Sequence, residues 1–207
     1  MKDDELKGRR NFTVAIFGSA RIQKGSSIYQ EIHDLAAMIS EAGMNIVTGG
    51  GPGLMNAASE GHLHGRGEKK VQSIGLKIKL PFEEVESSHL DIKKDFSRFS
   101  SRLDSFISYS NAVVVATGGI GTLLEFIYTW QLLQVKHINN IPIILLGEMW
   151  FHFVDWIKKW PLKQKLLDPE DMDLLFLAKD VHEAFNMITQ AYELYQKKGA
   201  SPRLHEI

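Results

Sequence analysis

The feature that most constrains the fold is a buried apolar run followed at once by glycines and a helical pattern. Ala112–Val115 is continuous and rich in valine, which is typical of a parallel strand covered on both faces. Gly118, Gly119 and Gly121 come next, and a helical pattern extends from Leu123 to about Val135. This order predicts the strand–turn–helix unit of a parallel α/β fold.

Strand-like and helix-like segments alternate along the rest of the chain. Strands are predicted at 12–17, 44–48, 71–78, 90–92, 112–115, 142–146 and 174–177. The other helices are predicted at 26–42, 52–64, 97–109, 149–165 and 181–197. The alternation implies a doubly wound, Rossmann-like and mostly parallel sheet with helices on both faces. We expect a charged N-terminal extension at 1–11, a single nucleotide-binding domain at 12–198 and a tail at 199–207.

Composition excludes several classes of function. The 207 residues carry a net charge of −1, so the chain lacks the basic field that nucleic-acid binding needs. The absence of cysteine excludes disulfides, thiol catalysis and thiolate metal sites, and the eight histidines show no metal-ligand spacing. No apolar run reaches the roughly 20 residues of a membrane span, and the charged stretch 1–10 does not resemble a signal peptide. We expect a cytoplasmic protein without metal, membrane or nucleic-acid partners.

Three predicted strands end in loops that suit a ligand. Their candidate binding residues are Gly18, Ser19, Gly49, Gly50, Gly51, Gly118, Gly119, Gly121 and Thr122. Glycines allow close approach to backbone N–H groups, and the N-terminus of a helix attracts phosphate. Carboxyl ends of parallel strands bind ligands where the strand order reverses, so these loops are expected to converge. Neither a Gly-x-Gly-x-x-Gly after the first strand nor a P-loop is present, which disfavours dinucleotide cofactors and ATP hydrolysis.

Thr122 and Glu125 share one face of the helix that follows the third loop. Thr122 can cap the helix or give its hydroxyl to a phosphate oxygen. A carboxylate such as Glu125 is unusual in a site that only holds phosphate. It would lie beside the anion, at a distance suited to chemistry on the group that the phosphate carries.

Several stretches occur in the order and spacing of a known family: Phe17–Arg21, Gly49–Met55, Ser73–Phe82, Arg102 and Gly118–Glu125. With these residues the chain, over roughly 12–190, resembles the bacterial branch of the Lonely Guy family. Its members are cytokinin riboside 5′-monophosphate phosphoribohydrolases, often labelled putative lysine decarboxylases. The resemblance implies hydrolysis of the N-glycosidic bond of AMP-like or cytokinin nucleotides to free base and ribose 5-phosphate. It also implies a homodimer that needs no cofactor.

The resemblance makes Arg102 and Glu125 the catalytic residues and Gly118, Gly119, Gly121 and Thr122 the phosphate site. The chemistry is consistent with this assignment. Cleavage passes through an oxocarbenium-like ribose, by analogy with glycoside hydrolysis. A carboxylate near the anomeric carbon can stabilise that charge and orient or deprotonate water. The planar guanidinium of Arg102 can hold the glutamate, the ribose hydroxyls or the phosphate.

Four positions depart from the family pattern: Leu103, Thr117, Leu124 and Gln131. They leave open a nucleotide-binding or carrier protein of the same fold with little turnover. Amino-acid decarboxylation is disfavoured, because it needs pyridoxal phosphate on a lysine and the three loops contain none. Segments 126–133 and 150–160 carry more large apolar side chains than one sheet face needs, which favours a homodimer that buries a helix pair.

Overall fold

The computed structural model describes residues 11–79 and 87–198, which contain one sheet of seven strands. The strands are β1 (Thr13–Phe17), β2 (Asn45–Thr48), β3 (Ser73–Ile78), β4 (Ile92–Phe96), β5 (Ala112–Val115), β6 (Ile143–Leu146) and β7 (Leu175–Ala178). The helices are α1 (Ser27–Glu41), α2 (Leu54–Gly65), α3 (Phe99–Tyr109), α4 (Ile120–Gln134), α5 (Glu148–Ile157), the π-helix η2 (Lys158–Leu162), α6 (Pro169–Met172) and α7 (Val181–Lys198). Apart from Asn11, the expected N-terminal extension and tail lie outside the described residues.

All strand pairs are parallel, in the order β4-β3-β2-β1-β5-β6-β7. The chain starts at the centre with β1, builds outward to β4, returns to β5 beside β1, and then builds to the other edge. The strand order therefore reverses between β1 and β5, and the prediction of a doubly wound α/β fold is confirmed. In open parallel sheets such a reversal opens a crevice at the carboxyl ends of the two strands.

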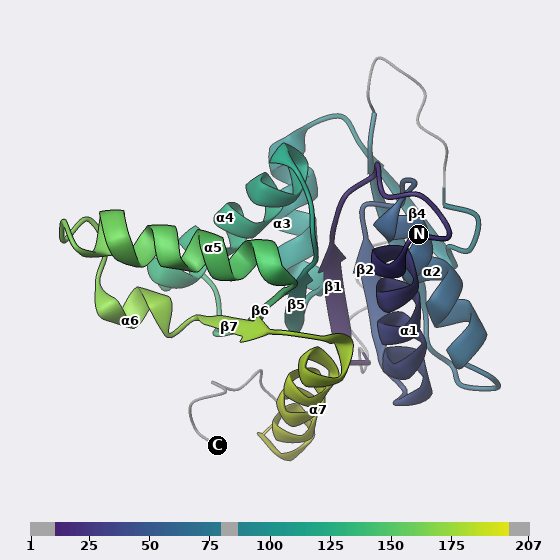
Figure 1. The fold of residues 1–207 in the computed structure, drawn as a ribbon. Coiled ribbons are helices and arrows are strands. Elements are labelled where there is room, and N and C mark those ends of the chain that lie inside the picture. The colour runs from purple at the N-terminus through teal and green to yellow at the C-terminus, as the bar shows by residue number, and fades with distance from the viewer. Residues whose placement is uncertain (1–10, 80–86, 199–207) are drawn as a thin grey trace.

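Helices cover both faces of the sheet, as Figure 1 shows. Alternate residues of β1 serve the two cores: Val14 and Ile16 pack against α1, α2 and α7, and Ala15 and Phe17 face α3, α4 and α5. All four side chains are buried. Burial on both faces explains why β1 carries a continuous apolar run rather than an alternating pattern.

The predicted strand at 90–92 was misplaced, because β4 begins at Ile92 and continues to Phe96. Three of the five residues in its sequence, Ile-Lys-Lys-Asp-Phe, are charged, so it lacks a continuous apolar run. Among the described strands β4 pairs with β3 alone and forms the edge of the sheet. Lysines are favoured on edge strands because they discourage pairing with other chains.

Two predicted helix starts were also wrong. α4 begins at Ile120 rather than Leu123, with Gly119 as its N-cap residue. α2 begins at Leu54, so Pro52 precedes the helix instead of opening it. The N-cap residue of α2 is Gly53, whose φ of 66° lies in the region that favours glycine.

The predicted helix at 149–165 is divided. α5 ends at Ile157, and the next turn, η2, is a π-helix that contains Pro161. Proline has no backbone N–H to donate within a regular α-helix, so the hydrogen-bond ladder changes at this point. The short helix α6 had no counterpart in the sequence prediction.

Candidate functional site

The loops that follow β1, β2 and β5 meet at the point where the strand order reverses. The backbone N–H of Ser19 donates to the carbonyl of Thr117 at 3.1 Å, which joins the β1 loop to the β5 loop. The N–H of Leu54 donates to the carbonyl of Ser19 at 2.9 Å, which joins the β2 loop to the same residue. Ser19 therefore lies between the two glycine-rich loops.

The β5–α4 loop presents the start of α4 to solvent. Gly119 and Gly121 are exposed, and a side chain at either would meet open space. A Cβ at Gly118 would overlap the side chain of Thr122, so this glycine lets Thr122 pack beneath the loop. Among the described residues, no side chain caps this end of the helix. Its first N–H groups are oriented to receive an anion.

Thr122 is the third residue of α4 and is buried, so it is not the helix cap that the sequence suggested. Its place in the first turn keeps it within the anion-binding geometry of the helix start. Glu125 follows one turn later and is also buried. The structure thus brings the glycine loop, Thr122 and Glu125 together on one end of one helix.

The glycines of the β2 loop have different roles. A Cβ at Gly49 would overlap Nη2 of Arg102, so Gly49 makes room for that guanidinium. Gly50, at φ 70°, donates its N–H to Oγ1 of Thr48 at 3.1 Å and accepts from Ser87 N at 3.0 Å. Both backbone groups of Gly50 are therefore paired within the protein, and Gly51 is buried. Gly49 is the glycine of this loop that lies against the candidate catalytic residue Arg102.

The glycine at position 18 serves packing. A Cβ there would lie 2.9 Å from Cδ1 of Leu54, the first residue of α2. Ser19 is partly exposed, and its Oγ accepts the N–H of Arg21 at 3.0 Å. Of this pair, Ser19 offers a side chain near the site and Gly18 allows α2 to approach β1.

Arg102 of α3 and Glu125 of α4 form a buried ion pair. Nη1 of Arg102 lies 3.0 Å from Oε1 of Glu125, and the two side chains are 10% and 11% exposed. Arg102 also donates from Nε to the carbonyl of Leu76 in β3 at 2.7 Å. Its guanidinium lies 5.0 Å from the ring centre of Phe106. These contacts from three elements fix the arginine and, through it, the carboxylate.

Burial raises the pKa of Glu125 to about 7, although the charge and hydrogen bond of Arg102 act in the opposite direction. A carboxyl group with such a pKa exists in both protonation states near neutral pH. Perturbed groups of this kind cluster at functional sites. The pair therefore combines a fixed cation with an acid that can take up or release a proton.

The positions that depart from the expected pattern are spread through α3, α4 and the β5 loop. Leu103 is buried, whereas Leu124 is 42% exposed beside Glu125. Thr117 lies in the loop and accepts the hydrogen bond from Ser19. Gln131 is exposed and donates to Gln134 at 3.1 Å. Thr117 is thus the departure within the glycine loop, and Leu124 is the one next to Glu125 in the sequence of α4.

Sequence reasoning missed the partners that hold Arg102. The carbonyl of Leu76, the ring of Phe106 and the missing Cβ of Gly49 come from separate elements. The one available signal was the glycine run after β2, which was interpreted only as a ligand loop. Within residues 11–79 and 87–198, no group of three or more His, Cys, Asp or Glu is placed to hold a metal ion. No helix in this part of the chain is long and apolar enough to cross a membrane.

Comparisons with known proteins place the fold. A family model with the description "Possible lysine decarboxylase" matches residues 55–188, and no curated protein sequence matches the chain. Similar solved structures include a molybdenum cofactor binding protein from the phototrophic bacterium Rippkaea orientalis, at 19% identity and a TM-score of 0.63, covering 88% of this chain and 97% of that one. The molybdenum cofactor carrier protein of Chlamydomonas reinhardtii is 24% identical with a TM-score of 0.57, and the match covers 87% of this chain and 98% of that one. DNA processing protein A from Helicobacter pylori is 18% identical with a TM-score of 0.55, and the match covers 91% of this chain and 84% of that one. Structures this distant in sequence share the fold alone.

Proposed function

Because the chain belongs to the Lonely Guy family, whose model is described as "Possible lysine decarboxylase", we propose that it hydrolyses the N-glycosidic bond of a nucleoside 5′-monophosphate. The products are the free base and ribose 5-phosphate, and AMP and cytokinin riboside 5′-monophosphates are the substrates to test. The observation that carries the proposal is the buried pair of Arg102 and Glu125 beside the uncapped start of α4.

In this proposal the start of α4 holds the substrate phosphate. Backbone N–H groups around Gly118–Thr122 supply the donors, and the partial positive charge of the helix favours the anion. The residue one turn further along the same helix is Glu125. A phosphate bound here would bring the attached ribose toward the carboxylate, because the 5′-phosphate and the anomeric carbon belong to one sugar.

Glu125 acts on the reacting carbon. As the bond between C1′ and the base nitrogen breaks, its electron pair leaves with the base, and the ionised carboxylate stabilises the positive charge that develops on the ribose. The carboxylate takes a proton from the water that attacks C1′, and the departing base gains a proton, so that free base and ribose 5-phosphate result. Arg102 favours the ionised form at a buried position where desolvation opposes it. The arginine also fixes the direction of the carboxylate through the 3.0 Å contact.

The direct test is incubation of the purified protein with AMP and with a cytokinin riboside 5′-monophosphate. Chromatography should detect free base and ribose 5-phosphate in equal amounts. The Glu125→Gln protein, prepared in the same way, is the control for contaminating nucleotidases and nucleosidases. Release of base at the same rate by both proteins would contradict the proposal.

A second candidate is a nucleotide-binding or carrier protein with little turnover. Two of the similar structures are a molybdenum cofactor binding protein and a molybdenum cofactor carrier protein. Leu124, exposed beside Glu125, also departs from the pattern of the enzymes. Tight binding of a nucleotide without release of base would favour this candidate. Lysine decarboxylation is not proposed, since none of the three loops holds a lysine for pyridoxal phosphate.

We also propose that the protein is a cytoplasmic homodimer, although the sequence argument for the dimer changes. Four large side chains of the two helix segments pack inside the chain instead of facing outward: Phe126, Trp130, Leu133 and Trp150. The exposed apolar residues of α4 are Ile120, Leu124 and Ile127, at 87%, 42% and 41%. Their spacing places them on one helix face, which suits a second copy. Light scattering should give the mass of a dimer for wild type. Ile127→Lys, on the proposed face, should lower the mass toward that of a monomer, and the control Val135→Lys should leave it unchanged.

A further inference from the structure

A cavity opens next to the loops that follow β1 and β2, on the side of the sheet covered by α1 and α2. Its volume is about 670 Å³, within the range of small-molecule sites. The walls come from the β1–α1 loop, from α1, from the start of α2 and from Ser88. Neither Arg102 nor Glu125 is among the described residues that line it.

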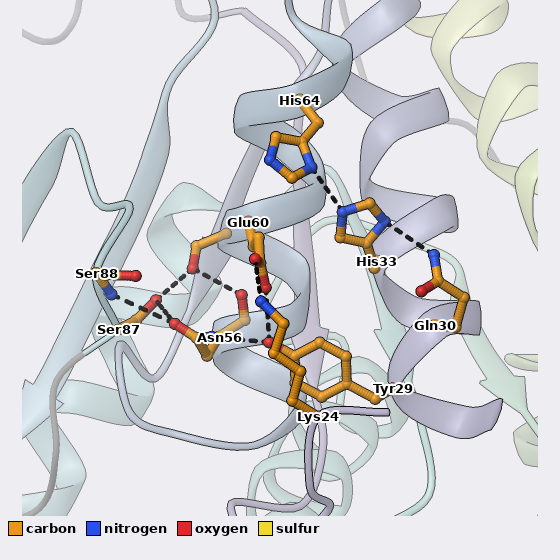
Figure 2. A network of polar contacts seen from close by, with 10 residues as sticks. Lys24, Tyr29, Gln30, His33, Asn56, Glu60, His64, Ser87 and Ser88 are labelled. Carbon is orange, nitrogen blue, oxygen red and sulfur yellow. Dashed lines mark hydrogen bonds and ion pairs between the residues drawn. The ribbon is translucent and has the colours of Figure 1, made fainter. Parts of the chain in front are cut away.

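A continuous polar network fixes the walls of this cavity (Figure 2). Lys24 lies 2.5 Å from Oε1 of Glu60, and the hydroxyl of Tyr29 donates to Oε2 of the same carboxylate at 2.9 Å. Asn56 donates to the Tyr29 hydroxyl at 2.8 Å and accepts from the N–H of Ser88 at 3.3 Å. The network ties the β1–α1 loop to both helices and to the segment before β4.

In this network the side-chain oxygens of Glu60 and Asn56 accept hydrogen bonds, whereas Lys24 and Asn56 keep unused donors. Both oxygens of Glu60 are engaged, and the side-chain oxygen of Asn56 accepts from Ser88 and from the Ser87 hydroxyl. Lys24 and the Asn56 amide retain further N–H groups, because an ammonium and an amide carry more donors than these contacts use. The cavity therefore offers a ligand unused donors from Lys24 and Asn56.

Arg21 adds a positive charge that no described acidic residue pairs with. It lines the cavity and is exposed, and no acidic side chain within residues 11–79 and 87–198 forms an ion pair with it. The negative charge of Glu60 is already paired with Lys24. Their contact lowers the pKa of Glu60 and raises the pKa of Lys24. Among the described lining and network residues, one cation is thus in excess.

Ser19 also links the cavity wall to the candidate catalytic edge. Ser19 donates its N–H to Thr117 on one side, and its carbonyl accepts from Leu54 on the other. Its hydroxyl accepts the N–H of Arg21, and the cavity wall begins at the next residue, Ala20. The start of α4 and the Arg21 cavity therefore lie on two sides of one residue.

We propose that the cavity lined by Arg21, Lys24 and Asn56 is a second phosphate subsite, adjoining the one at Gly118–Thr122. An arginine fork suits a phosphate dianion, and the remaining donors of Lys24 and Asn56 complete the set. The phosphate is either a second group of the nucleotide or a separate inorganic anion. Binding of a second nucleotide phosphate rests on the proposed function, because that function places the first phosphate at α4. Binding of a separate inorganic anion does not depend on the proposed function.

The test is calorimetric binding in the Glu125→Gln background, in which turnover does not interfere. The probes are AMP, ADP, adenosine 3′,5′-bisphosphate, and inorganic phosphate added to protein saturated with AMP. ADP or adenosine 3′,5′-bisphosphate should bind about tenfold tighter than AMP, or inorganic phosphate should bind beside AMP. Arg21→Ala should abolish that gain and change AMP affinity less than about twofold, and Arg21→Lys should keep part of it.

Two further variants sharpen the result. Lys163→Ala removes an exposed charge far along the chain and should leave every affinity unchanged. Glu60→Gln removes the compensating negative charge, so it should tighten binding of the second phosphate by a few-fold. The proposal is overturned if Arg21→Ala and Lys163→Ala give the same affinities for all probes. If the wild-type protein releases no base while Arg21→Ala still weakens binding of the second phosphate, the proposed hydrolysis is refuted and the subsite stands.

Discussion

Gly49→Ala should impair the protein by displacing Arg102. The added methyl would overlap Nη2 of Arg102 and lie 2.6 Å from Sδ of Met55. Methionine is flexible and can move aside. The guanidinium cannot do so without loss, because it is held by the Leu76 carbonyl at 2.7 Å and by Glu125 at 3.0 Å.

The size of the effect follows from these distances. Relief of the overlap to ordinary carbon contact needs a shift of roughly 1 Å at the guanidinium. A misplacement of about 1 Å at a catalytic group can cost about 100-fold in rate, or about 2.7 kcal/mol of barrier. We therefore expect Gly49→Ala to lower the rate of base release about 100-fold. Nucleotide affinity should change little, because the phosphate is held at α4.

The assay compares single-turnover base release, nucleotide affinity and thermal unfolding for wild type, Gly49→Ala and Gly49→Ala/Met55→Ala. An unchanged melting temperature would show that the loss is local. A rate within about twofold of wild type would refute the reasoning. If the rate recovers in the double variant, the loss in Gly49→Ala comes from the clash with the Met55 sulfur and not from displacement of Arg102.

Two other predictions concern stability. The pKa of Glu125 is about 7 in the folded protein and near 4.5 in the unfolded chain, so the folded protein holds the proton more tightly. The contribution of this group to the free energy of unfolding is therefore fully present below pH 4.5 and is lost as the pH rises to 7. The free energy of unfolding of wild type should therefore fall by about 3 kcal/mol relative to Glu125→Gln over this range, and a difference independent of pH would contradict the assignment. Gly53→Ala should destabilise by about 1–3 kcal/mol, since the residue has φ 66° and its Cβ would meet the backbone of Ser19 and Ala20. Urea unfolding measures this loss of stability. Gly121→Ala is the matched control, because a Cβ at Gly121 would meet open space.

Much of the fold could be predicted because burial on both faces leaves continuous apolar runs. β1 and β5 were placed within a residue of their observed bounds for this reason. β4 was misplaced because an edge strand tolerates charge, and its two lysines hide it. The start of α2 was missed because the φ of Gly53 depends on contact with the β1 loop, which local sequence does not encode.

The site was predictable as a set of residue types but not as a geometry. The glycine runs predicted which loops would bind a ligand, and the structure brings those loops together beside Arg102 and Glu125. The role of Gly49 depends on an arginine more than fifty residues away, so no local pattern reveals it. The apolar residues around Phe126 likewise gave no sign of which would be covered by α5 and which exposed.

The measurement that tests the central claim most directly is single-turnover release of base from AMP, or from the best nucleotide found, by wild type and Glu125→Gln. The glutamine keeps the shape of the side chain and removes its charge. We predict a rate lower by about 10²–10³-fold, with nucleotide affinity retained, because one preorganised electrostatic partner of the transition state is lost. Hydrolysis by Glu125→Gln within about twofold of wild type would contradict the catalytic role of Glu125.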